Sequence, residues 1–298
     1  MNDLAPIVLF VYNRLWHTQK TVNALQKNDL VIDSELFVYS DNARDEKVQT
    51  DVDAVRAYIK TITGFKKITI VEQSKNKGLA NSIIEGVTEV VNTYGKVIVL
   101  EDDLVTSPHF LRFMNDALSF YEKEKRVWHV SGWSYPINME SVGDVFLWRF
   151  MNCWGWATWK DRWQYFEKNV DKCIATFSKD DIYRFNLDGA EDFWSHVLAN
   201  KKGRMNTWAI FWYAWIFKKN GLCINPRQTF VQNIGHDGSG VNCDDEDFFS
   251  SEMVQTYDVG FISEITENDI VLTRVGEFYK KRQSVAKRII NGMSKLMK

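Results

Sequence analysis

The first 125 residues alternate short apolar runs with amphipathic stretches, and no other feature of the sequence constrains the fold as strongly. The apolar runs have the length of β-strands, and they occupy residues 6–12, 35–40, 67–72 and 96–101. Segments with apolar residues at helical spacing follow them, at residues 18–26, 48–62, 78–94 and 107–122. This alternation is typical of βαβ units, so we predict an α/β fold with a mostly parallel, Rossmann-like sheet and helices on both faces.

Each predicted strand is followed by polar residues. These clusters are Tyr12-Asn13-Arg14, Ser40-Asp41-Asn42, Glu72-Gln73-Ser74 and Glu101-Asp102-Asp103. Ligands of open α/β sheets bind beyond the carboxyl ends of the strands, so we expect the four clusters to converge on one binding edge.

The acidic triplet Glu101-Asp102-Asp103 is the most informative of these clusters. Adjacent carboxylates repel one another unless a cation or hydrogen-bond donors compensate their charge. Mg²⁺ or Mn²⁺, held by one or two carboxylates and by substrate phosphates, would do so. The alternative interpretation is a solvated acidic turn whose negative charge favours the start of the next helix.

From about residue 125 onward the chain has a different character. Eleven of the 12 tryptophans lie between Trp128 and Trp215. Strands are predicted at residues 127–132 and 145–150, and helices at 157–167, 189–201 and 207–220. We therefore divide the sequence into three segments, 1–125, 126–276 and 277–298, of which the second is rich in Trp.

Composition argues against several classes of protein. The formal net charge of -2 provides no basic field, so we expect no nucleic-acid partner. Four scattered cysteines without a C-x-x-C pair indicate neither a zinc site nor a disulfide framework. No apolar stretch has the length of a membrane span or of a signal sequence, so we expect a cytoplasmic protein.

The C-terminal segment 280–298 is strongly basic. It holds seven Lys or Arg residues and no acid, with apolar residues at helical spacing between them. This pattern is typical of a helix that lies on an anionic membrane surface, which would make the protein peripheral on the inner face of the cell membrane. An exposed or partly packed tail helix is the alternative.

The strand-ending acids, within VIVLEDDLVTSPHFLRF, resemble the metal and nucleotide motif of the N-acetylglucosaminyltransferase I family and of related bacterial family-2-like glycosyltransferases. The resemblance covers most of the chain, because further segments follow in the family's order: PIVLFVYNR, LFVYSDN, KNKGLANSIIEGV, VWHVSGWS, WGWATW and TWAIFW with the strand beyond it. It implies a GT-A fold and a metal-dependent glycosyltransferase that uses a nucleotide sugar, with a UDP-sugar favoured. Residues 1–125 would then bind the donor, and residues 126–276 the acceptor.

The resemblance also implies roles for individual residues. Asp103 resembles the direct ligand of Mn²⁺ or Mg²⁺, and Asp102 the residue that faces the ribose and the metal. Further donor contacts are implied for Arg14, Asp41, Glu101, Trp208 and Ser239. Negative charge grows on the diphosphate leaving group in the transition state, and the metal and Arg14 would stabilise it.

One departure from the family pattern concerns the general base. The family has an Asp directly after the Trp that Trp208 matches, and this chain has Ala209, which cannot accept a proton. Three carboxylates are candidates to replace it, ranked Asp237, Asp192 and Glu191, and a further candidate is His236. Asp237 ranks first because it lies between glycines in GHDGSG, a loop that could close over the donor.

The tryptophan tract bears on the acceptor. Most of these rings are expected in the core, and we predict that one or two of Trp133, Trp154 and Trp156 line the acceptor site. The leading hypothesis is an inverting hexosyl- or N-acetylhexosaminyltransferase that acts on a glycan or lipid-linked acceptor in surface polysaccharide synthesis.

Two alternative functions stay open. A nucleotidyltransferase also combines such a sheet with a metal, but VYNRLWHTQK lacks a glycine-rich phosphate loop. A non-catalytic subunit that binds nucleotide sugars or glycans would explain Ala209.

Overall fold

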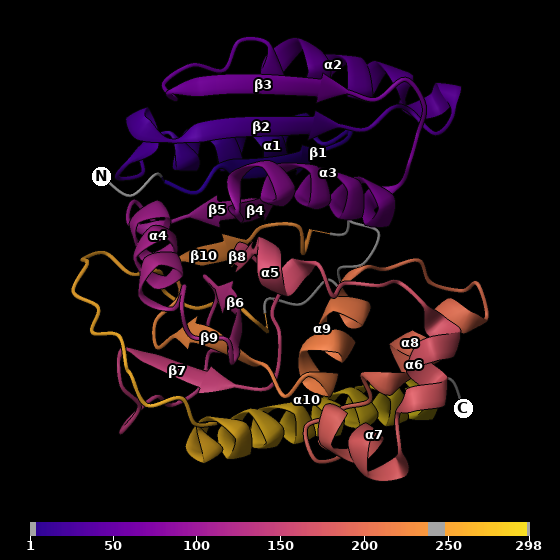
Figure 1. Cartoon of the computed structure of the whole chain (residues 1–298). Coiled ribbons are helices and arrows are strands. Elements are labelled where there is room, and N and C mark those ends of the chain that lie inside the picture. Colours follow the sequence, from indigo (N-terminus) through magenta and orange to yellow (C-terminus); the bar gives the residue numbers. More distant parts are fainter. Residues whose placement is uncertain (1–3, 238–247, 297–298) are drawn as a thin grey trace.

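The computed structural model describes residues 4–237 and 248–296. Its strands are β1 (Ile7–Val11), β2 (Glu35–Ser40), β3 (Lys67–Glu72), β4 (Lys96–Glu101), β5 (Leu104–Thr106), β6 (Val127–Ser131), β7 (Val145–Trp148), β8 (Trp156–Trp159), β9 (Leu222–Pro226) and β10 (Val231–Asn233). Eight of them form one sheet in the order β3-β2-β1-β4-β8-β6-β9-β7, and β10 and β5 form a separate pair (Figure 1).

The helices alternate with the first four strands and then dominate the second half of the chain. They are α1 (Leu15–Leu25), α2 (Gln49–Ile59), α3 (Leu79–Tyr94), α4 (Phe110–Phe120), α5 (Lys160–Trp163), α6 (Val170–Thr176), α7 (Lys179–Phe185), α8 (Trp194–Lys201), α9 (Ala209–Lys218) and α10 (Asp269–Leu296), with short 3₁₀ turns η1 (Val31–Asp33) and η2 (Glu46–Val48).

The first half confirms the predicted α/β fold with a parallel sheet. Strands β1 to β4 are all parallel, and every residue of β1 is buried, as its unbroken apolar run predicts. Right-handed crossovers from β1 to β2 to β3 place α1 and α2 on one face, where they contact each other. The connection from β3 back to β4 places α3 on the opposite face, so helices cover both sides.

Strand β8 joins the two halves of the chain into one sheet. It pairs antiparallel with β4 on one side and with β6 on the other. The helix predicted at 157–167 is therefore wrong over its first part, and only α5 is helical there. Trp156 to Trp159 form a strand because aromatic and β-branched side chains, all buried, complete the ladder beside β4.

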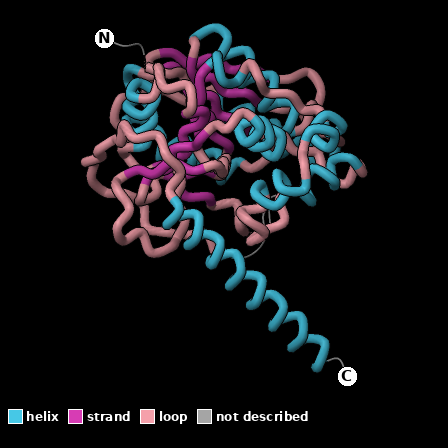
Figure 2. Tube along the Cα trace, turned by 60° about the horizontal axis from the view of Figure 1, so that its bottom comes forward, coloured by secondary structure: helices cyan, strands magenta, loops and turns pink. Residues whose placement is uncertain are grey.

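The C-terminal helix α10 is longer than expected. It begins at Asp269 rather than at 277, and its first turns pack on the body through buried Val271, Val275 and Tyr279. The Tyr279 and Tyr135 hydroxyls are 2.9 Å apart and share a hydrogen bond. Figure 2 shows the later turns of α10 extending away from the rest of the chain.

None of the helices within 4–237 and 248–296 combines the length and the apolar character needed to cross a bilayer.

Candidate functional site

The ends of β1 and β4 bring one arginine against two aspartates. Because these strands are parallel neighbours, the residues that follow them meet at the same sheet edge. The Arg14 Nη2 nitrogen donates to Asp102 Oδ1 and, over 2.8 Å, to Asp103 Oδ2. Both aspartates are buried, with 5% and 6% of their surface exposed. One nitrogen thus marks a point on which two buried carboxylates converge.

The electrostatics of this cluster reflect charges held out of water. Burial raises the pKa of Glu101 to about 8, and the charges of Asp103 and Asp102 add to the effect. Burial likewise raises the pKa of Asp102 to about 6, although the Arg14 charge opposes it. Burial disfavours the Arg14 charge, yet the two aspartates raise the pKa of its guanidinium above its ordinary value. The cluster therefore has more negative charge than Arg14 alone neutralises.

The side chains of this cluster suit a divalent cation that is held in part by the substrate. Within the described residues no group of three His, Cys, Asp or Glu side chains could hold a metal. Mg²⁺ and Mn²⁺, however, commonly take one or two protein carboxylates and complete their shell with water and substrate phosphates. Asp102 and Asp103, aimed at one point, fit that smaller set. Beside them, the buried Arg14 Nη1 has no hydrogen-bond partner in the described part of the chain and could donate to a phosphate.

Strand β10 brings the loop at Gly235 into contact with Asp103. It pairs antiparallel with β5, and the Ile234 N–H donates to the Asp103 carbonyl over 2.9 Å. The next residue, Gly235, lies so close that an added Cβ would collide with Asp103 Oδ2 and approach Arg14 Nη1 to 3.1 Å. Any larger residue here would force the Asp103 carboxylate to move, because its Cβ and the carboxylate oxygen cannot share this space. Sequence reasoning identified this loop but not its pairing with β5.

Asp237, the first-ranked base candidate, lies beside α1. Its Oδ2 is 3.0 Å from Nε2 of His17, a residue that is almost fully buried on α1. The charge of His17 also acts on Asp102, so Asp237 and the aspartate cluster share a neighbourhood. Ser239, the predicted donor contact in the same loop, lies outside the described residues.

The other two base candidates are placed differently. Asp192 is exposed, and its Oδ1 accepts the Ser195 N–H over 3.1 Å at the start of α8. This carboxylate caps the start of α8, and its role as a base stays a prediction. Glu191 lies near two buried tyrosines. Burial chiefly raises the pKa of Tyr135 and of Tyr279, and the charge of Glu191 adds a smaller contribution to each.

The Asp41 carboxylate accepts hydrogen bonds from neighbouring residues of the chain. Its two carboxylate oxygens accept the N–H groups of Asn42, Lys77 and Gly78 over 2.8 to 2.9 Å, and the Asn76 amide over 3.1 Å. Four donors fill the acceptor capacity of a carboxylate. In this structure Asp41 fixes the loop before α3, and its contact with a nucleotide base stays a prediction.

An aromatic cavity of about 220 Å³ lies beside His236, the residue that follows Gly235. Ala209, the first residue of α9, lines it together with Trp133, Trp154 and Tyr279. The His236 ring packs edge-on against Trp154, with centroids 5.4 Å apart, and connects the cavity wall to Gly235. Of the three tryptophans predicted for the acceptor site, Trp133 and Trp154 line this cavity and Trp156 does not.

Trp156 and Trp208 belong to the core instead. Their rings stack with centroids 4.9 Å apart, and Trp208 has only 3% of its surface exposed. Little of the Trp208 surface is open to a ligand in this structure, and its role as a donor contact stays a prediction. Burial of a large aromatic surface accounts for both residues.

Comparison with known proteins gives distant structural similarities. No family model and no curated protein matches the chain. The crystal structure of S. aureus TarS is similar over 42% of this chain and 21% of its own, with a TM-score of 0.30 and 17% identity, so the chain spans about a fifth of that protein. The mannosyltransferase PcManGT from Pyrobaculum calidifontis, in complex with GDP-Man and Mn2+, is similar over 73% of this chain and 72% of its own, with a TM-score of 0.43 and 15% identity.

Proposed function

We propose that this chain is a metal-dependent glycosyltransferase of the GT-A type that transfers a sugar from a nucleotide sugar. One observation carries the proposal, namely that the Asp102 and Asp103 carboxylates converge on a single Arg14 nitrogen at the carboxyl edge of a parallel sheet. Two buried carboxylates and an arginine form a set suited to a cation and a diphosphate. The motif resemblance favours a UDP-sugar as the donor.

The chain's own groups have distinct tasks in this reaction. Asp103 and Asp102 would hold the cation, which when bound neutralises charge on the diphosphate. Arg14 donates hydrogen bonds to the diphosphate through its unused Nη1 nitrogen. The backbone at Gly235 covers Asp103, so water is excluded from one side of the carboxylate.

Transfer requires a base for the acceptor hydroxyl. In an inverting displacement the acceptor oxygen bonds to the sugar C1, the C1–O bond to the diphosphate breaks with its electron pair, and the hydroxyl proton passes to a carboxylate. Asp237 suits this role best, because its Oδ2 lies 3.0 Å from Nε2 of His17, on the helix that follows Arg14. Glu191 ranks second, since its charge reaches the tyrosines of the aromatic cavity.

The aromatic cavity is our candidate for the acceptor site. Its tryptophan rings could stack on the apolar face of a sugar, and Trp154 joins it to the loop at Gly235 through His236. The acceptor would be a glycan or a lipid-linked sugar of a surface polysaccharide, and the sugar transferred a hexose or an N-acetylhexosamine. A cytoplasmic protein attached to the inner membrane face through residues 280–298 would suit a lipid-linked acceptor.

The proposal is tested by a screen of nucleotide sugars for binding and slow hydrolysis. Each donor is titrated into the full chain by calorimetry with Mn²⁺, with Mg²⁺ and with EDTA, and release of the nucleotide is followed in parallel. We expect one UDP-sugar to bind at least tenfold more tightly with a divalent cation than with EDTA. Absence of cation-dependent binding for every nucleotide sugar would overturn the proposal.

Ala209 supports a second candidate, a subunit that binds the donor or a glycan without catalysis. The methyl group of Ala209 lines the aromatic cavity at the position where the resembled family has its base. Under this hypothesis the donor binds with cation but no acceptor is glycosylated, and Ala209→Asp restores measurable turnover. Transfer by the parent chain would exclude it.

A further inference from the structure

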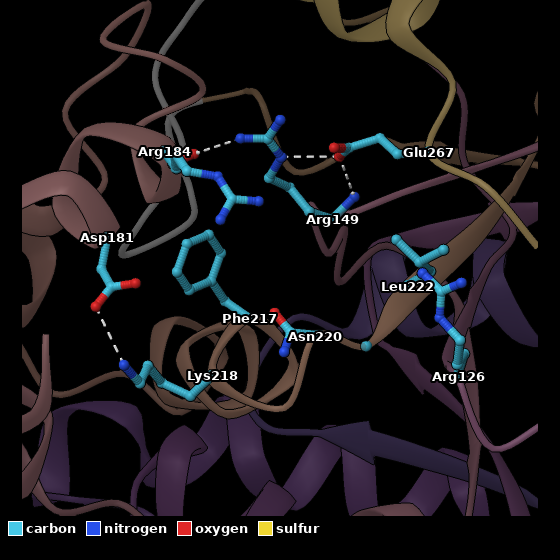
Figure 3. A pocket seen from close by; sticks show the side chains of 10 residues that line it. Arg126, Arg149, Asp181, Arg184, Phe217, Lys218, Asn220, Leu222 and Glu267 are labelled. Atoms are coloured by element: carbon cyan, nitrogen blue, oxygen red, sulfur yellow. Dashed lines mark hydrogen bonds and ion pairs between the residues drawn. The ribbon is translucent and has the colours of Figure 1, made fainter.

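A second cavity has a volume of about 330 Å³. Figure 3 shows the residues that line it, several of them from α7 and α9. Because β8 is antiparallel to both β4 and β6, the strands β6 and β9 run in the same direction as β4. Arg126 precedes β6 and Leu222 begins β9, so this cavity borders the amino ends of these strands. Asp102 and Asp103 follow the carboxyl end of β4, which makes the two sites separate.

The lining of this cavity is rich in positive charge. Its charged residues are the cations Arg126, Arg149, Arg184 and Lys218 and the acids Asp181 and Glu267. The acids already have partners, since Lys218 pairs with Asp181 at 3.1 Å and Arg149 with Glu267 at 2.8 Å. Arg149, which is 8% exposed, also pairs with Asp188 at 3.1 Å from outside the lining.

Two guanidinium groups are left without a carboxylate partner among the described residues. Arg126 donates to the carbonyl of Ile265 over 2.8 Å and forms no ion pair there. Arg184 lies over the Phe217 ring, with 5.6 Å between its guanidinium carbon and the ring centroid. Figure 3 shows Arg184 above Phe217 and Arg126 on the other side of the cavity. The cavity therefore carries two positive charges that no carboxylate of the described residues offsets.

We propose that this cavity binds a small phosphate-bearing molecule of about the size of a sugar phosphate. Guanidinium groups bind phosphate oxygens through paired N–H donors, and a third guanidinium in the lining, that of Arg149, is held in place by Glu267. The Phe217 ring and the Leu222 side chain provide an apolar surface for the organic part of the ligand. The volume lies at the lower end of the range of small-molecule sites. This inference does not depend on the glycosyltransferase proposal.

The test is calorimetric titration of the full chain with glucose 1-phosphate, pyrophosphate and glucuronate, in buffer with EDTA and without phosphate. We expect saturable binding of glucose 1-phosphate, weakened on the order of tenfold by Arg184→Gln and by Arg126→Gln. Both arginines are exposed, so neither substitution removes core packing. Arg204→Gln is the matched control, since Arg204 is exposed and lies outside the cavity.

The binding of glucose 1-phosphate is compared between the parent chain and the four variants. Binding that falls in the two cavity variants, and is retained in Arg204→Gln and Arg14→Gln, supports it. No saturable binding by the parent chain, or an equal loss in Arg204→Gln, overturns it. Binding lost only in Arg14→Gln would assign the phosphate to the donor site and overturn a second site. Equal affinity for glucuronate would overturn the preference for phosphate.

Discussion

Gly235 packs directly on the carboxylate of Asp103, although the two residues belong to chain segments far apart in sequence. The Ile234 N–H bond to the Asp103 carbonyl and the pairing of β10 with β5 bring them together. An added Cβ on Gly235 would collide with Asp103 Oδ2. The arrangement of the aspartate cluster therefore depends on an achiral residue in a different part of the chain.

Gly235→Ala is expected to displace the Asp103 carboxylate and to weaken cation-dependent donor binding by tenfold or more. The reason is steric, because the new methyl group takes space that Asp103 and Arg14 occupy. Calorimetric titration with a UDP-sugar and Mn²⁺ measures the effect. Gly143→Ala is the control, since its nearest neighbour would lie 3.5 Å from the new Cβ, an ordinary contact. Unchanged binding in Gly235→Ala would contradict the prediction.

Asp103→Asn should reduce the donor affinity measured with Mn²⁺ to the level measured with EDTA. The amide keeps the shape of the side chain but supplies a neutral, weaker ligand to a hard cation. The substitution also removes a like charge beside Asp102, so the fold should be retained, as judged by circular dichroism and thermal unfolding. Asp258→Asn, at an exposed position, serves as the control for loss of charge. A Mn²⁺ dependence that survives in Asp103→Asn would mean that the metal ligand is another residue.

Asp237→Asn should lower transfer by on the order of a hundredfold, while donor binding changes little. The amide cannot accept the hydroxyl proton but can still approach His17. Transfer and binding are measured separately, by product formation and by calorimetry. Asp192→Asn should have little effect on transfer, because Asp192 caps α8. If Glu191→Gln rather than Asp237→Asn abolishes transfer, the base lies at the tyrosine end of the aromatic cavity.

His129 makes stability sensitive to acid. Burial lowers the pKa of His129 from 6.5 to about 3, although its hydrogen bond to the Asn152 carbonyl favours the charged form. Its Nε2 lies 2.8 Å from that carbonyl, and its Nδ1 accepts the Trp212 indole N–H over 3.2 Å. Only the neutral Nε2–H tautomer satisfies both contacts, so protonation would break the bond to Trp212.

The sign of the effect follows from proton binding. Below pH 6.5 the unfolded chain binds a proton at His129 that the folded chain does not, so the free energy of unfolding falls as pH falls towards 3. This residue contributes about 1.4 kcal/mol per pH unit in that window. Urea unfolding between pH 7.5 and 4.5 should show a shallower dependence in His129→Asn than in the parent. As a control, replacement of the exposed His196 by Asn should leave the pH dependence of the unfolding free energy as it is in the parent. A pH dependence that is also unchanged in His129→Asn would contradict the prediction.

Truncation after Gln283 should release the protein from anionic vesicles without loss of folding. The cut preserves the packed turns of α10 with Tyr279, and it removes four of the basic residues of the tail. Each basic residue near an anionic surface contributes about 1 kcal/mol of attraction. Sedimentation with phosphatidylserine vesicles measures the loss, and neutral vesicles provide the control. Equal binding by the truncated and full chains would exclude the tail as the membrane contact.

The sequence by itself determined the parallel half of the sheet and the edge at which the polar clusters meet. Apolar periodicity is a local property, and right-handed βαβ units convert it into a defined sheet edge. Arg14, Asp102 and Asp103 could therefore be assigned to one place from the order of residues alone, because each closely follows a buried strand.

Only the tertiary structure decided which other residues reach that place. The pairing of β5 with β10 joins segments without any local signal of their contact, and it brings Gly235 and Asp237 to the aspartates. Trp208 is core because Trp156 stacks on it across the fold, and Asp41 is occupied because the loop before α3 folds onto it. These outcomes depend on long-range packing and on competition for hydrogen bonds, which residue types and spacing along the chain do not encode.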